Sequence, residues 1–108
     1  MRIVDGKKFY KKDIDACVSL NFDGWDSYNG RNYQYYYVRY NPECGLVILE
    51  GDNSGDCYGD YETRYFASPA RFRLWCKEAG RSLAKLMGDV DEGNDAQMAF
   101  VAAAYPDN

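Results

Sequence analysis

The fold depends most on a tyrosine-rich stretch, residues 33–40, which reads YQYYYVRY. In a β-strand, successive side chains point to opposite faces of the sheet. We expect the core-facing side of this strand to carry Tyr36, Val38 and Tyr40. The opposite face then carries Tyr33, Tyr35, Tyr37 and Arg39. The stretch therefore predicts a strand with tyrosines on both of its faces.

The strand expected to pair with this stretch covers residues 14–22. Apolar residues alternate there with mostly polar ones, which is the period of a half-buried strand. A helix over residues 11–18 is the alternative, because Ile14, Cys17 and Val18 also fit helical spacing. We predict the strand.

A hairpin connects these two segments. Asn29-Gly30 predicts a two-residue turn, with residues 25–28 paired to residues 31–34. Gly24 predicts a bulge, since a glycine inside a strand pattern often marks an extra unpaired residue. The bulge would make the facing pairs Val18 with Tyr40, Leu20 with Val38, and Phe22 with Tyr36. Apolar residues then face apolar residues throughout, so we predict this register.

Shorter signals place the other strands. Asp5-Gly6 predicts a tight turn between short strands at residues 3–4 and 9–10. A turn at residues 41–43 leads into an apolar run at residues 45–49, which predicts a central strand covered on both faces. Residues 51–60 are rich in Gly and Asp and predict a loop, and residues 61–66 predict a last strand.

The apolar period changes to that of a helix after residue 66. Ser68-Pro69 predicts the start of a helix and Gly88 its end. Its apolar side would carry Phe72, Cys76, Ala79, Leu83 and Leu86. A basic row on the opposite side is Arg73, Lys77, Arg81 and Lys85, for which we expect a solvated helix face. Asn94 and Gln97 have the spacing of a capping box for a second helix from Asp95 to about residue 104.

Together these patterns predict an α+β fold, with an antiparallel β-meander of about four to five strands followed by two C-terminal α-helices packed on one face. The length of 108 residues predicts a single domain over residues 1–108. No apolar run reaches the roughly 18 residues that a membrane span needs. The N-terminus has no apolar segment behind its basic residues, so no signal peptide is expected.

The cysteines predict a protein without a metal or a disulfide. Cys17, Cys44, Cys57 and Cys76 are widely spaced, and the chain contains no His. Zinc sites usually draw on close Cys pairs, often with His. We therefore expect four reduced thiols in a cytoplasmic protein, and no cofactor. A zinc site and a disulfide are the alternatives.

Residues 50–62 contain five acidic residues and no basic one. An EF-hand loop starting at Asp52 fails, because position six is Cys57 instead of Gly and position twelve is Thr63 instead of Glu. We expect a solvated acidic loop that attracts a basic partner, with a less regular divalent-cation site as the alternative.

The sequence offers little for catalysis. Without His there is no ordinary Ser-His or Cys-His relay, and no P-loop, dinucleotide-binding glycine motif or nucleophile elbow occurs. Carboxylate pairs such as Asp13/Asp15 or Asp56/Asp60 would need a raised pKa in a cleft to act as acid and base. We expect the protein not to be an enzyme.

The tyrosine face beside Ser19, Asn21 and Asp23 has the composition of a binding patch, because Tyr and Arg are enriched at interface hot spots. Burial under the loop at 51–60 or under the N-terminal hairpin is the alternative. Stacking of single-stranded nucleic-acid bases is a further alternative. Residues 13–66 carry ten acidic and three basic residues, however, which argues against phosphate binding.

These features predict a small acidic protein, of net charge −4, that binds and inhibits another macromolecule. The expected partner is a protein with a basic surface, and neither a membrane nor nucleic acid. The residues expected to bind it are Tyr33, Tyr35, Tyr37, Arg39, Asp23, Asp52, Asp56, Asp60 and Glu62. By analogy of size and charge alone, phage anti-defence proteins such as anti-CRISPRs, and toxin-immunity proteins, are comparable classes.

Overall fold

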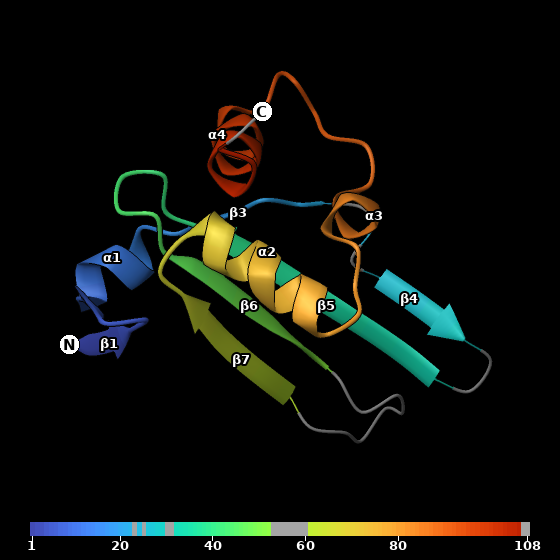
Figure 1. Cartoon of the computed structure of the whole chain (residues 1–108), viewed down its shortest axis with the longest axis horizontal. Coiled ribbons are helices and arrows are strands. Elements are labelled where there is room, and N and C mark those ends of the chain that lie inside the picture. The colour runs from blue at the N-terminus through green and yellow to red at the C-terminus, as the bar shows by residue number, and fades with distance from the viewer. Residues whose placement is uncertain (23, 25, 30–31, 53–60, 107–108) are drawn as a thin grey trace.

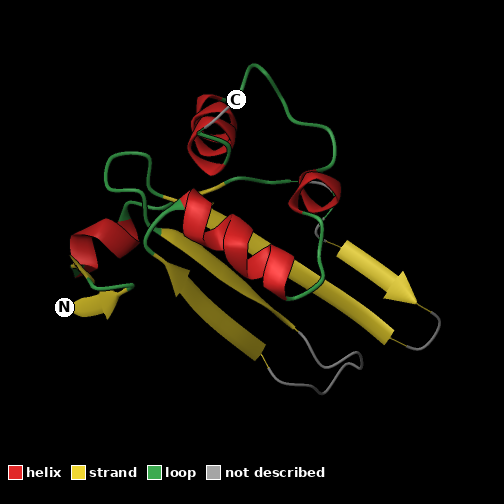
Figure 2. Cartoon of the chain, in the orientation of Figure 1, coloured by secondary structure: helices red, strands yellow, loops and turns green. Residues whose placement is uncertain are grey.

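The computed structural model describes residues 1–22, 24, 26–29, 32–52 and 61–106. It confirms the α+β fold, with an antiparallel sheet followed by C-terminal helices (Figure 1 and Figure 2). The strands are β1 (Arg2–Val4), β2 (Lys7–Phe9), β3 (Val18–Ser19), β4 (Asp26–Asn29), β5 (Asn32–Tyr40), β6 (Val47–Asp52) and β7 (Tyr61–Phe66). The helices are α1 (Lys11–Asp15), α2 (Pro69–Glu78), α3 (Leu83–Met87) and α4 (Asp95–Ala104).

The described residues form two antiparallel sheets. One is the hairpin of β1 and β2, which confirms the predicted tight turn at Asp5 (φ 50°) and Gly6 (φ 79°); both φ angles are positive, as in a type I′ turn. Its second strand is Lys7–Phe9 instead of residues 9–10. The other sheet has the order β3-β5-β6-β7, and β4 also pairs with β5. β7, predicted over residues 61–66, has those bounds.

The strand predicted over residues 14–22 is wrong in its first half, where the helical alternative is nearer the structure. The backbone N–H of Tyr10 donates to the Asp13 carboxylate at 2.8 Å, and the chain then coils as α1. Ile14 and Cys17 both pack against the same cluster of apolar residues, as helical spacing allows. The strand begins only at Val18.

The predicted register is confirmed where β3 meets β5. Val18 faces Tyr40, and the Leu20 N–H donates to the Val38 carbonyl at 2.9 Å. The predicted hairpin pairing is wrong, because Tyr28 faces Tyr33 and Asn29 faces Asn32.

The connection between β3 and β4 is also longer than a bulge. Ser19 pairs with Arg39 and Asp26 pairs with Tyr35, so seven positions on one side correspond to four positions along β5. The connection therefore contains three residues without a partner position on β5, whereas a bulge would contain one.

Apolar side chains form a core on each face of the sheet. The main core lies between the sheet and α2, α3 and α4, which cover one face (Figure 1). The second core lies on the opposite face and contains Val4, Phe9, Leu46 and Ile48. Residues 46–49 are fully buried between the two, which confirms the prediction of a central strand covered on both faces.

The single helix predicted from residue 69 to residue 87 is two helices, so three helices follow the sheet in the described part of the chain. Ser68 caps α2 as predicted, accepting a hydrogen bond from the Arg71 N–H. The helix ends at Gly80, where φ is +73° and the Arg81 N–H donates to the Cys76 carbonyl at 2.8 Å. Ser82 then caps α3.

The second predicted helix, α4, begins at Asp95 and is capped by Asn94, as predicted. Its Gln97 does not complete the expected capping box. The buried Gln97 amide instead donates to the Leu20 carbonyl at 2.6 Å and accepts a hydrogen bond from the Asp91 N–H at 2.8 Å. It therefore joins α4 to the end of β3.

Candidate protein-binding face of the sheet

The candidate site is the sheet face opposite the three C-terminal helices. Val38 and Tyr40 lie in the main core, so the alternate positions 37 and 39 belong to the other face. The register places Tyr37 opposite Glu50, and Glu50 opposite Thr63. Three adjacent strands therefore contribute to one row of positions.

The N-terminal hairpin and α1 cover only one end of this face. They pack on Ile48, which lies opposite both Arg39 and Tyr65 in the next row. Arg39 is consequently half-buried, whereas Tyr37 is 57% exposed. Cover by the N-terminal hairpin, which was one alternative for the tyrosine face, thus reaches the row of Arg39, whereas most of Tyr37 stays exposed. Cover by the loop at 51–60, the other alternative, depends on residues 53–60, which lie outside the described residues.

Arg39 forms an ion pair with Glu50 on the neighbouring strand. The two side chains are 34% and 25% exposed, so water screens the pair only in part. Beside them, the Ser19 hydroxyl donates to the Asn21 side-chain oxygen at 2.8 Å. The charged groups next to Tyr37 are therefore held in place, and Arg39 is not available as an isolated cation.

The other predicted tyrosines are described by their backbone alone. Tyr33 faces Tyr28, and Tyr35 lies between Asp26 on β4 and Asp52 on β6. Strand alternation gives positions 33 and 35 the same face as position 37.

The predicted acidic residues do not form one group. Asp52 ends β6, which runs further than expected, and its position belongs to the face of Tyr37. Glu62 lies on β7 and forms an ion pair with Arg64, whose guanidinium carbon is 5.3 Å from the centroid of the Trp75 ring on α2. Glu62 therefore belongs to the helix-covered face, on the opposite side of the sheet from Tyr37. Asp23, Asp56 and Asp60 lie outside the described residues.

Sequence reasoning placed Glu50 in the acidic loop and not beside Tyr37, and it did not select Thr63 as a member of the site. The pairing of residue 37 with residue 50, and of residue 50 with residue 63, would have identified them. That pairing depends on the turn at residues 41–45, where the Asn41 side chain accepts a hydrogen bond from the Glu43 N–H. The residue types of the turn predict its presence but not its length.

Two of the described thiols, those of Cys17 and Cys76, are poorly suited to nucleophilic chemistry at neutral pH. Cys17, Cys44 and Cys76 are free. Burial raises the pKa of Cys17, and that of Cys76, from 9.0 to about 11. Since the thiolate is the reactive form, both side chains are protonated and unreactive near pH 7. Within the described ranges, no group of three or more His, Cys, Asp or Glu is arranged to hold a metal ion.

None of the described helices has the length and apolar character needed to cross a membrane. Comparison of the chain with protein-family models, with curated proteins and with solved structures found no match.

Proposed function

We propose that the chain is a non-enzymatic binding protein whose open sheet face, centred on Tyr37, docks on a basic protein surface and inhibits the partner by covering it. The observation that supports this proposal is the exposure of Tyr37. This residue is 57% exposed on a sheet face, next to the Arg39–Glu50 ion pair. Exposure of a large aromatic side chain to water is unfavourable, and burying Tyr37 against a partner would remove that exposure.

The side chain of Tyr37 suits a contact residue for two physical reasons. Tyr offers a large amphipathic surface and loses few rotamers on binding, which is why it is common at interface hot spots. In addition, its neighbours are rigid, since Arg39 and Glu50 hold each other on adjacent strands. A preorganised surface loses less conformational entropy when it docks.

The charge of the face favours a basic partner. The positions of the sheet itself on this face include the acids Asp26, Glu50 and Asp52 and the base Arg39, a formal charge of −2. Arg2 of the hairpin lies over Tyr65 at the covered end of the face and adds one positive charge there. The net negative charge of the face would repel the phosphates of a nucleic acid and would accelerate encounter with a basic protein surface. Base stacking on the tyrosines is therefore the less favoured function.

The proposal is tested by capturing the partner from the source cell with tagged wild-type and variant chains. We expect Tyr37→Ala to reduce retention of the captured protein by about 30-fold, which corresponds to a hot spot of about 2 kcal/mol. Tyr10→Ala is the matched control, because Tyr10 is 49% exposed and lies outside the face. It should retain the partner as the wild type does. Added wild-type chain should also inhibit the activity of the purified partner.

Two results would overturn the proposal. One is unchanged retention by a folded Tyr37→Ala variant, as judged from its circular dichroism spectrum. The other is tight, salt-sensitive binding of single-stranded RNA or DNA in a mobility-shift assay, which would favour base stacking instead.

A further inference from the structure

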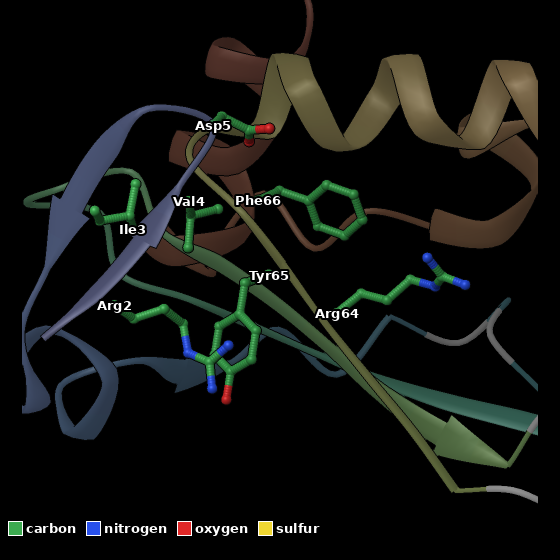
Figure 3. A pocket seen from close by; sticks show the side chains of 7 residues that line it. All are labelled: Arg2, Ile3, Val4, Asp5, Arg64, Tyr65 and Phe66. Atoms are coloured by element: carbon green, nitrogen blue, oxygen red, sulfur yellow. The ribbon is translucent and has the colours of Figure 1, made fainter.

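A groove separates β1 from β7 at the far edge of the sheet (Figure 3). Its volume is about 380 Å³, and it is lined by residues 2–5 on one side and 64–66 on the other. Consecutive residues of a strand alternate between two faces, so a run of consecutive lining residues indicates that the strand edges themselves border the groove.

Both of these edges lack a second strand. Among the described residues, β1 pairs with β2 alone and β7 with β6 alone. An edge strand presents unpaired N–H and C=O groups that can bind another extended segment. Here two such edges face each other across one groove.

Two contacts hold the sides of the groove in place. At the closed end, the Asp5 carboxylate accepts a hydrogen bond from the Ala67 N–H at 2.9 Å. Arg2 reaches from β1 towards β7, and its guanidinium carbon lies 4.0 Å from the centroid of the Tyr65 ring (Figure 3). The spacing of the edges is therefore set before any ligand binds, which lowers the entropy cost of binding.

The side chains around the groove favour an acidic ligand. Arg2 lines it, and residues 1–12 carry five basic residues against one acidic residue, Asp5. Arg64 also lines it, but its guanidinium is paired with Glu62 on the same strand. The Asp5 carboxylate is already engaged by the Ala67 N–H, and Ile3, 62% exposed, adds apolar surface at the rim. We propose that the groove binds an extended acidic peptide segment of a partner protein, which adds as a strand between β1 and β7. This proposal is independent of the Tyr37 face.

The test uses a fluorescein-labelled, N-acetylated and C-amidated hexapeptide of alternating Glu and Val, titrated with the full chain and followed by fluorescence anisotropy. A strand held between two edges uses its successive amides alternately toward the two sides. We therefore expect N-methylation of either of the two adjacent central amides to weaken binding at least tenfold. A ligand bound at one edge, or by its charges, would lose affinity for at most one of them.

Variants of the chain test the charge and the place of binding. Arg2→Glu should weaken binding of the peptide at least tenfold, whereas Arg71→Glu, an exposed cation at the start of α2, should leave it unchanged. Tyr37→Ala should also have no effect, which separates this site from the proposed function. The proposal is overturned if the peptide shows no saturable binding below about 1 mM. Binding that is unaffected by central N-methylation, by Arg2→Glu, or by replacing Glu with Lys in the peptide would overturn it as well.

Discussion

At the scale of single residues, Gly24 lies too close to helix α3 for any side chain. A Cβ atom at this position would lie 2.2 Å from the carbonyl oxygen of Lys85 and 2.4 Å from that of Leu86. Both oxygens belong to the helix backbone, so neither can be moved by rotating a side chain. The backbone at position 24 can therefore approach the end of α3 this closely only because the residue is glycine.

We expect Gly24→Ala to lower the free energy of unfolding by about 3 kcal/mol, the upper part of the range for overpacking substitutions. Gly93→Ala is the matched control, because its Cβ would meet only a side-chain atom, the Asp91 Oδ1, at 3.3 Å. It should change the free energy by less than about 1 kcal/mol. Urea denaturation of the three proteins provides the measurement, and equal midpoints for both variants would contradict the close approach at Gly24.

We expect Cys76 to make the fold less stable at alkaline pH. Its side chain is fully buried in the main core, and burial raises the pKa of the thiol from 9.0 to about 11. Between these two pH values the unfolded chain loses the thiol proton while the folded chain keeps it. The folded state then binds more protons than the unfolded state, so the free energy of unfolding falls as the pH rises through this range.

We expect Cys76→Ala to remove part of this loss, by up to about 3 kcal/mol between pH 9 and pH 11. The measurement is the urea midpoint of wild type and variant at several pH values, since the other titrating groups are common to both proteins. Below pH 8 the difference between the two proteins should not depend on pH. Parallel curves across the whole range would show that Cys76 ionises equally readily in the folded state.

At the scale of elements, the sequence predicts best those structures whose signals are local. The turn at Asp5-Gly6 and the caps at Ser68 and Asn94 each depend on a few adjacent residues, and all three are confirmed. The break between α2 and α3 was missed because the apolar residues keep helical spacing across it. Helix α1 was missed because Ile14 and Val18 fit both the strand period and the helical period.

Part of the candidate site likewise depends on contacts between residues that are far apart in the sequence. Alternation along β5 alone was enough to group Tyr37 with Arg39. The ion pair of Arg39 with Glu50, however, follows from the pairing of β5 with β6. The sequence also could not show that Glu62 belongs to the other face, because that requires the register of β7 against β6.

Gly80 ends helix α2 through its backbone conformation and not through a close contact. Its φ is +73°, and nothing lies within 4 Å of the position of an added Cβ. We expect Gly80→Ala to destabilise the fold by about 1–2 kcal/mol, the cost of the left-handed conformation for a residue with a Cβ atom. Gly80→Asn should cost less, because Asn tolerates this conformation better. Thermal or urea unfolding would measure both, and an equal or greater loss for Asn would contradict this explanation.

At the scale of the whole molecule, β6 contributes side chains to both cores, one on each face of the sheet. Leu49 and Val47 face the helices, whereas Ile48 faces the N-terminal hairpin and α1. The hairpin forms a separate sheet, yet its Phe9 is 1% exposed because it packs into the second core. The prediction of a single domain therefore requires the hairpin to unfold together with the main sheet.

We expect Phe9→Ala to lower the free energy of unfolding of the whole chain by about 3–5 kcal/mol, as for other large buried aromatic residues. Ile3→Ala is the control in the same hairpin, since Ile3 is 62% exposed, and it should cost less than about 0.5 kcal/mol. Urea unfolding would be followed by tryptophan fluorescence, to which Trp25 and Trp75 both contribute, and by far-ultraviolet circular dichroism; Trp75 packs against the main core. If the hairpin folds with the sheet, both signals shift to the same lower midpoint. A Phe9→Ala variant that keeps the wild-type midpoint, while amide exchange accelerates only in residues 1–9, would show instead that the hairpin is a separate unit attached to the sheet.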